Sequence, residues 1–147
     1  MGILVREGTI DEVVSTYPFI PELENPYQKA DYESRLAVSP NHLVLVAVEG
    51  ERVVGFKVGY QRDYDGSFYS WMGGVSNQHR RLGIAQRLAD AMEDWCVSKG
   101  YHTLRFKTRN RHKAMLRFAL SNGFNLIGVE PAEQVEESRI WLEKRLS

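Results

Sequence analysis

Hydrophobic residues along this chain alternate between a period of two, typical of strands, and a period near 3.6, typical of helices. Runs rich in β-branched and aromatic residues predict seven strands, at 3–9, 42–62 (two strands around a tight turn), 67–75, 102–109, 124–130 and 138–146. Helical spacing predicts four helices, one after residue 9, one at 27–38, one from 84 to 99 and one through 114–119. The order βααβββαβαββ predicts an α/β fold, a mixed sheet of about seven strands flanked by four helices, because strand–helix–strand connections run parallel.

Particular residues support these boundaries. Thr9 followed by Glu12 forms a capping box at the start of the first helix. Three prolines within residues 18–26 interrupt the helical pattern. Lys99-Gly100 ends the third helix with a basic last turn and a glycine in the usual position after it. The residues at 42–49 are apolar on both faces, which predicts a covered strand inside the sheet.

Length and composition predict one globular domain spanning residues 1–147. The chain has 147 residues, of which 43% are hydrophobic and 26% charged. No apolar run approaches the roughly 18 residues that a membrane span needs, and we see no secretory signal. The single cysteine, Cys96, lies on a helical stripe beside Trp95. It favours packing over nucleophilic chemistry and is consistent with a reducing, cytoplasmic location.

Charge is distributed unevenly although the total is balanced. Nineteen Lys/Arg cancel nineteen Asp/Glu. Residues 1–66 hold six Lys/Arg against eleven Asp/Glu, whereas residues 79–117 hold ten against three. This asymmetry predicts two ligand faces, a basic one for an anion and an acidic one for a cation.

The stretch from 73 to 95 has the features of an anion site. Two glycines end a predicted strand at Gly73-Gly74, and Arg80, Arg81 and Gly83 precede an amphipathic helix. The N–H groups in the first turn of a helix lack internal partners and carry partial positive charge. Gly83 has no Cβ, so the oxygens of an anion can approach the backbone closely. The pattern is neither a Walker loop nor Gly-x-Gly-x-x-Gly.

The same stretch carries a family signature. Residues 80–85 match Arg/Gln-x-x-Gly-x-Gly/Ala, and the chain resembles the GCN5-related N-acetyltransferase (GNAT) family over nearly its whole length. The resemblance implies acetyl-CoA as co-substrate. It places the pyrophosphate at 81–85, the pantetheine arm along 73–75 and Asn110 near the sulfur. The implied cofactor-binding residues are Gly73, Gly74, Val75, Arg80, Arg81, Leu82, Gly83, Ile84, Ala85 and Asn110.

Two departures from that family concern catalysis. Many members have a tyrosine, thought to protonate the departing thiolate, where this chain has Ala119. The strand at 67–75 has no Glu or His where many relatives place the base that deprotonates the amine. Other candidate bases are Glu22 and Glu24 in the proline-bounded loop, Glu33 on the second helix, and then Asp63, Asp65 and Tyr69 around the turn before residue 67. Of these we favour Glu24 or Glu22, as part of the wall that receives the acceptor.

The region of the first two helices predicts the nature of that acceptor. It combines carboxylates with aromatic rings, namely Glu22, Glu24, Asp31, Glu33, Tyr17, Phe19, Tyr27 and Tyr32. Such a wall suits a cationic amine through charge and cation–π attraction. The sequence therefore predicts an N-acetyltransferase that acts on a primary amine of a small cationic molecule or of a protein.

Other functions remain open at this point. The missing tyrosine is consistent with a non-catalytic acyl-CoA-binding module. The basic run at 105–113 makes nucleic-acid binding an alternative function. Against it, the net charge is zero and aromatic residues are not interleaved with the run as a stacking platform. We expect no nucleic-acid or membrane partner, and no metal, since His79, His102 and His112 match no compact ligand spacing. Exposed strand edges near the C-terminus can pair two chains into a homodimer.

Overall fold

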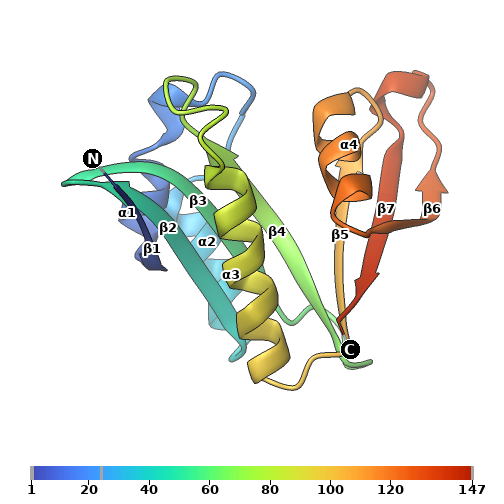
Figure 1. Ribbon diagram of the computed structural model, residues 1–147. Helices are drawn as coiled ribbons and strands as arrows, with labels where there is room; N and C mark the ends of the chain where they lie inside the picture. Colours follow the sequence, from blue (N-terminus) through green and yellow to red (C-terminus); the bar gives the residue numbers. More distant parts are fainter. Residues whose placement is uncertain (1, 24, 147) are drawn as a thin grey trace.

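A seven-stranded sheet in the order β1-β2-β3-β4-β5-β7-β6 forms the frame of the molecule (Figure 1). The computed structural model describes residues 2–23 and 25–146. The strands are β1 (Ile3–Glu7), β2 (His42–Glu49), β3 (Arg52–Tyr60), β4 (Ser67–Val75), β5 (Thr103–Arg109), β6 (Asn125–Glu130) and β7 (Arg139–Arg145). The helices are α1 (Ile10–Val14), α2 (Lys29–Ala37), α3 (Ile84–Ser98) and α4 (Lys113–Ser121), with two 3₁₀ turns, η1 (Tyr17–Phe19) and η2 (Val135–Glu137). The predicted fold class and element order are confirmed, and the 3₁₀ turns are additions to them.

Strands β4 and β5 run parallel, and their pairing is short. Residues 67–69 of β4 pair with residues 103–105 of β5. Beyond Tyr69, β4 remains paired with β3 through Val75, but its other edge has no strand partner among the described residues. The two strands therefore diverge in the middle of the sheet, and Figure 1 shows α3 on one side of the divergence and α4 on the other.

Helices cover both faces of the sheet because each presents an apolar stripe to it. On one face, α1 and α2 bury Val13, Tyr32 and Leu36 against Phe56 of β3 and its neighbours. On the opposite face, α3 buries a stripe of four residues against β2, β3 and β4, namely Ile84, Leu88, Met92 and Cys96. A smaller cluster under α4 contains Ala119, Ile140 and Leu142. Cys96 is fully buried, and burial raises the pKa of its thiol to about 12, so it packs rather than reacts.

The capping box predicted for the first helix is present. The hydroxyl of Thr9 accepts from the N–H of Glu12 at 3.2 Å, and Glu12 Oε1 accepts from the N–H of Thr9 at 3.0 Å. Glu12 also binds Arg6 at 2.6 Å, which lowers the pKa of this carboxyl. These contacts set the start of α1 and fix it to β1.

Candidate active site

The two glycines near the end of β4 face opposite sides of the sheet. A Cβ on Gly74 would lie 2.9 Å from Cδ1 of Ile20, so packing under the helices leaves no room for a side chain there. A Cβ on Gly73 would lie 3.8 Å from Cγ of Lys57 and would point into a small cavity on the other face. Gly74 therefore allows close packing, whereas Gly73 keeps space open beside the unpaired edge of β4.

The loop between β4 and α3 is held in place by contacts to distant elements. The ring of His79 lies 3.3 Å from Ser76 Oγ and 3.3 Å from a carboxylate oxygen of Glu49. The N–H of Asn77 donates to the carbonyl of Phe19 at 2.8 Å. Arg81 adopts φ 63°, a left-handed conformation that costs a non-glycine residue energy. These anchors maintain that conformation.

The start of α3 is open to an anion. Gly83 occupies the N-cap position at φ 77°, it supplies no capping side chain, and the first turn contains no acidic residue. Among the described residues, nothing occupies the space within 4 Å of a Cβ on Gly83. The N–H groups of this turn are therefore available to an anion. The side chain of Ile84 is only 2% exposed, so Ile84 can serve a ligand only through its backbone.

Arg80 does not extend toward that turn. Its guanidinium binds Glu22 at 2.6 Å and donates to the carbonyl of Val75 at 3.2 Å. The hydrogen bond from Arg80 lowers the pKa of Glu22. The structure thus pairs two residues for which the sequence predicted separate roles, one with the cofactor and one with the acceptor. The other predicted catalytic carboxylate, Glu24, lies outside the described residues.

Asn110 is engaged away from the divergence of β4 and β5. Its side-chain N–H donates to the carbonyl of Val135 at 3.2 Å, and its side-chain oxygen accepts from Lys113 at 2.9 Å. Its backbone N–H donates to Ser138 at 2.8 Å. Asn110 lines neither of the two cavities beside β4. It fastens the start of α4 to the turn before β7, which local sequence patterns do not reveal.

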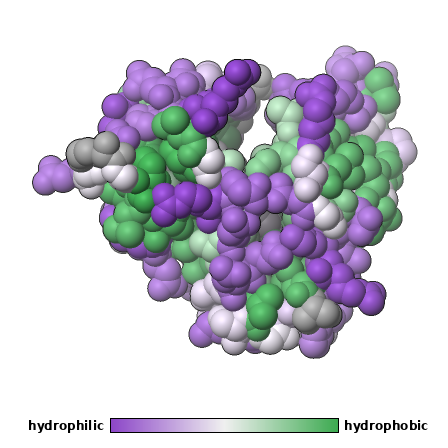
Figure 2. All heavy atoms as spheres, viewed as in Figure 1, coloured by the Kyte–Doolittle hydropathy of each residue, from purple (hydrophilic) through white to green (hydrophobic). Residues whose placement is uncertain are grey.

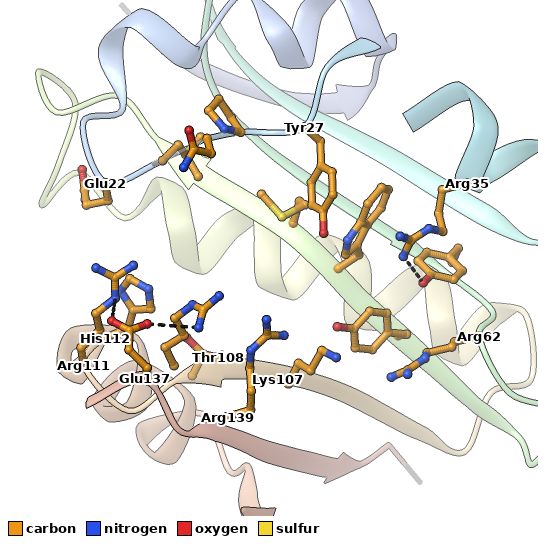
Figure 3. Close-up of a pocket in the computed structure, with 18 residues that line it drawn as sticks. Glu22, Tyr27, Arg35, Arg62, Lys107, Thr108, Arg111, His112, Glu137 and Arg139 are labelled. Carbon is orange, nitrogen blue, oxygen red and sulfur yellow. Dashed lines mark hydrogen bonds and ion pairs between the residues drawn. The ribbon is translucent and has the colours of Figure 1, made fainter. Parts of the chain in front are cut away.

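Two cavities meet where β4 and β5 diverge. The smaller, about 170 Å³, lies between α3 and α4 and includes Gly73, Lys57 and Phe118 in its lining. The larger, about 810 Å³, lies on the side of α2 and the loop that precedes it (Figure 3). Trp71, Met72 and Lys107 line both cavities, so these residues mark the passage between them. The space-filling view shows an opening between the part that carries α3 and the part that carries α4 (Figure 2).

The larger cavity differs from the predicted acidic wall. Of the acidic residues proposed for that wall and described by the structure, only Glu22 lines it. Asp31 instead accepts from the N–H of Gln28 at 2.8 Å and caps α2. Of the aromatic residues predicted for that wall, only Tyr27 lines the cavity, and its other rings, Tyr60, Tyr69 and Trp71, come from β3 and β4. The prediction of an acidic wall is therefore wrong for this cavity, because Asp31 caps α2 and Glu22 is paired with Arg80.

Sequence reasoning missed most of the charged residues around the larger cavity. They come from α2, from the turn after β3, from β5 and the turn between β5 and α4, and from η2 and β7, and they are Arg35, Arg62, Lys107, Arg109, Arg111, His112, Glu137 and Arg139. Only the basic excess in residues 79–117 signalled part of this set. No local pattern brings Arg35 and Arg139 to one place, because that requires the tertiary fold.

The smaller cavity contains one partly buried amine without a polar partner among the described residues. Lys57 projects from β3 beneath α3, and burial lowers the pKa of its ammonium to about 8. It has no hydrogen bond or ion pair with any residue that the structure describes, in contrast to Lys144, which binds Glu93 of the same lining at 2.9 Å. Residues 118 and 119 of α4 border the same space, and Ala119 is buried.

Over residues 2–23 and 25–146, no group of three or more His, Cys, Asp or Glu side chains has the arrangement needed to hold a metal ion. No helix within these ranges is long and apolar enough to cross a membrane.

The comparisons with known proteins agree with this architecture. The model of the acetyltransferase (GNAT) family matches residues 9–124, a range that contains both β4 and the start of α3. The chain belongs to the GNAT family. As a GNAT acetyltransferase it takes acetyl-CoA as co-substrate, and relatives have been crystallised with CoA or acetyl-CoA.

Solved GNAT structures share the whole fold at low sequence identity. The ribosomal-protein-S18-alanine N-acetyltransferase from Escherichia coli is 14% identical with a TM-score of 0.84, covering 99% of this chain and 95% of that one. Ard1 from Thermoplasma volcanium is 21% identical with a TM-score of 0.83, covering 100% and 99%. The phosphinothricin acetyltransferase from Sinorhizobium meliloti, in complex with acetyl-CoA, is 16% identical with a TM-score of 0.80, covering 100% and 90%. The search of curated protein sequences gave no match.

Proposed function

We propose that this chain transfers the acetyl group of acetyl-CoA to a primary amine. The observation that carries the proposal is the pair of cavities that meet at Trp71, Met72 and Lys107, beside the unpaired edge of β4. A thioester entering from the side of α3 and α4 and an amine entering from the side of α2 would meet at this passage. Such an arrangement supplies the proximity that acyl transfer requires.

The cofactor arm would run along β4 to the start of α3. Its amides would pair with the edge at 73–75, and its pyrophosphate would bind the backbone N–H groups at 81–85. The carbonyl of Val75 is already an acceptor for Arg80 at 3.2 Å. The amide of the arm would therefore share that carbonyl with the guanidinium or replace it.

The reaction itself needs two proton transfers. The amine lone pair attacks the thioester carbonyl, the carbon–sulfur bond breaks, and the sulfur leaves with the bonding electrons. An ammonium with an ordinary pKa near ~10.4 must first lose a proton to become a nucleophile. The thiolate that departs must then gain one. Side chains on the two sides of the passage can serve these two transfers separately.

On the acceptor side, His112 lies in the same lining as Glu22, the carboxylate that the sequence predicts to be catalytic, and we propose His112 as the base instead. Because Arg80 lowers the pKa of Glu22, this carboxylate holds a proton weakly and is a poor base. An imidazole ordinarily exchanges protons near neutral pH and is better suited to that step.

Substituting these two side chains separates their roles. We expect His112→Gln to lower kcat about 10-fold and to remove the acid limb of the pH–rate profile, as loss of a general base does. We expect Glu22→Gln to change kcat less than about 3-fold, because an exposed ion pair contributes little. Steady-state rates measured as thiol release between pH 6 and 9 give both values. A large loss of kcat in Glu22→Gln alone would assign the base to Glu22.

On the cofactor side, we propose Lys57 as the proton donor to the thiolate. It lines the cavity next to Gly73 and the position occupied by Ala119, where many relatives have the tyrosine. An ammonium with a pKa of about 8 is matched to a thiol, whose ordinary pKa is near ~8.5.

Titration calorimetry with acetyl-CoA, followed by thiol release on a panel of amines, tests the proposed function. We expect micromolar binding and amine-dependent release. Binding without release on every amine would favour the alternative of a non-catalytic acyl-CoA-binding module. A folded protein that does not bind acetyl-CoA would contradict the proposal.

Pairing of two chains stays a prediction. The edge strand β6 exposes about half of each of Leu126, Ile127 and Val129, at 52%, 50% and 52%. Unpaired edges of this kind can add a strand from a second chain. Sedimentation at two protein concentrations would show whether this edge forms a homodimer.

A further inference from the structure

The larger cavity is strongly cationic. Six Lys/Arg side chains and two Glu side chains line it, the cations being Arg35, Arg62, Lys107, Arg109, Arg111 and Arg139. Both carboxylates are already paired. Glu22 binds Arg80 at 2.6 Å, and Glu137 binds Arg109 at 3.1 Å and Arg111 at 3.5 Å. The lining therefore offers an amine acceptor no unpaired carboxylate among the described residues.

Four of the cations have no ion-pair partner among those same residues. They are Arg35, Arg62, Lys107 and Arg139. Figure 3 shows them around one space, with Arg35 across the cavity from Lys107 and Arg139. Glu130, which does not line the cavity, acts electrostatically on Lys107, Arg139 and Arg62 and offsets part of their charge, and its carboxylate accepts the indole N–H of Trp141. Four like charges around one cavity repel each other, and a bound anion would relieve that repulsion.

Aromatic rings lie beside three of these cations, Arg35, Arg62 and Lys107. The guanidinium of Arg35 lies 4.7 Å from the ring centre of Trp71 and donates to the hydroxyl of Tyr60 at 3.0 Å. Arg62 lies 5.2 Å from the ring of Tyr69 and 5.0 Å from that of Trp141. The rings of Tyr60, Tyr69 and Trp71, three of the four aromatic rings that line the cavity, are therefore already in contact with the protein's own cations.

The pKa of Lys107 reflects the positive charge gathered around this cavity. Its pKa is lowered chiefly by burial and then by the charges of Arg62 and Arg139. An anion between these side chains would favour the charged form of Lys107 and would receive planar, bidentate donors from the two guanidinium groups.

We infer that the acceptor is a small primary amine that also carries a carboxylate or a phosphate. Its anionic group binds among Arg62, Lys107 and Arg139, and its amine lies toward Trp71 and Met72, where the cavities meet. This inference rests on the proposed function and names the substrate class of the same site. It replaces the cationic acceptor expected from the acidic composition of the first helices.

Matched amines that differ only in the anionic group test the inference. One pair is ethanolamine and O-phosphoethanolamine, and another is an α-amino acid amide and the free α-amino acid. We expect kcat/KM to be at least about 10-fold higher for the anionic member of at least one pair, and higher than for spermidine. The pair that discriminates distinguishes phosphate from carboxylate. The preference should weaken as salt rises, because charge attraction is screened.

Variants of its lining residues test whether the preference for anionic amines arises in the larger cavity. Arg62→Gln and Arg139→Gln should each raise KM for the anionic amine at least about 5-fold while the Kd for acetyl-CoA stays unchanged. Arg117→Gln is the matched control, because Arg117 lies exposed on α4 and lines neither cavity. Equal loss in the control would overturn the assignment.

A binding measurement keeps the inference testable without turnover. Inorganic phosphate and succinate are titrated into the protein saturated with acetyl-CoA, and each should bind more weakly to Arg62→Gln. The inference fails if neither anion binds and no anionic amine is preferred, even where neutral or cationic amines are acetylated. Failure to bind acetyl-CoA at all is a separate result that contradicts the proposed function instead.

Discussion

Replacing Gly83 by Glu should raise the Kd for acetyl-CoA at least about 100-fold, which corresponds to about 2.7 kcal/mol. Gly83 caps α3 at φ 77°, with no acidic residue in the first turn. A carboxylate at this cap would occupy the open space in front of the turn's N–H groups and compete with the pyrophosphate for them. Calorimetric titration of the variant with acetyl-CoA measures the change.

A second glycine in the same chain supplies the control. Gly100 follows the other end of α3 at φ 86°, and a Cβ there also has nothing within 4 Å. Gly100→Glu therefore carries a similar left-handed strain and the same added charge, far from the proposed pyrophosphate site. We expect both variants to lose comparable stability and only Gly83→Glu to lose affinity. Equal loss of affinity in both would attribute the effect to destabilisation, and unchanged binding in Gly83→Glu would move the pyrophosphate elsewhere.

Local patterns predicted the features of this protein that depend on neighbouring residues. The stripe of Ile84, Leu88 and Met92 predicted α3 because residues at helical spacing share a face. The capping box predicted the start of α1 because it involves only Thr9 and Glu12, which lie three positions apart. The anion site at the start of α3 was predicted from Gly83 and from the two arginines that precede it.

Local patterns could not predict contacts between elements that are distant in the sequence. The partner of Arg80 is Glu22, 58 positions away, and Asn110 is bonded to a carbonyl 25 positions later. The charge of the larger cavity depends on Arg35, Arg62 and Arg139, whose neighbours in sequence give no sign that they converge. The sequence shows how many carboxylates the first helices carry, but it does not show that Asp31 caps α2 and so does not face the cavity.

Lys57 places a charge where the fold would be more stable without it. Burial lowers the pKa of its ammonium from an ordinary value of 10.5 to about 8. Below pH 8 the folded chain therefore keeps a charge in a partly buried position, at a cost of up to about 3 kcal/mol. A charged side chain that is partly removed from water without an ion-pair partner is expected mainly at functional sites. Its position in the cavity beside Gly73 supports the role of proton donor to the CoA thiolate.

We expect Lys57→Met to be more stable than the wild-type chain at pH 7, by about 1–3 kcal/mol, and to lower kcat about 10-fold. Between pH 8 and 10.5 the unfolded chain binds more protons at Lys57 than the folded chain does. The free energy of unfolding therefore rises with pH, by up to about 1.4 kcal/mol per unit, in the wild-type chain relative to the variant. Cys96 and Tyr69, whose pKa values burial raises to about 12, act in the opposite direction, but they are common to both chains.

Two measurements test the effect of Lys57 on stability and its role as proton donor together. They are urea unfolding of both chains at pH 7, 8 and 9 and steady-state kinetics at the same pH values. Lys57→Arg is the matched control, because it keeps a charge that does not titrate in this range and cannot readily donate its proton. Loss of kcat in both variants, with the stability gain confined to Lys57→Met, supports proton donation. A gain in stability with unchanged kcat in both would leave Lys57 a buried charge without a catalytic role, and the thiolate would then depart without a proton from the protein.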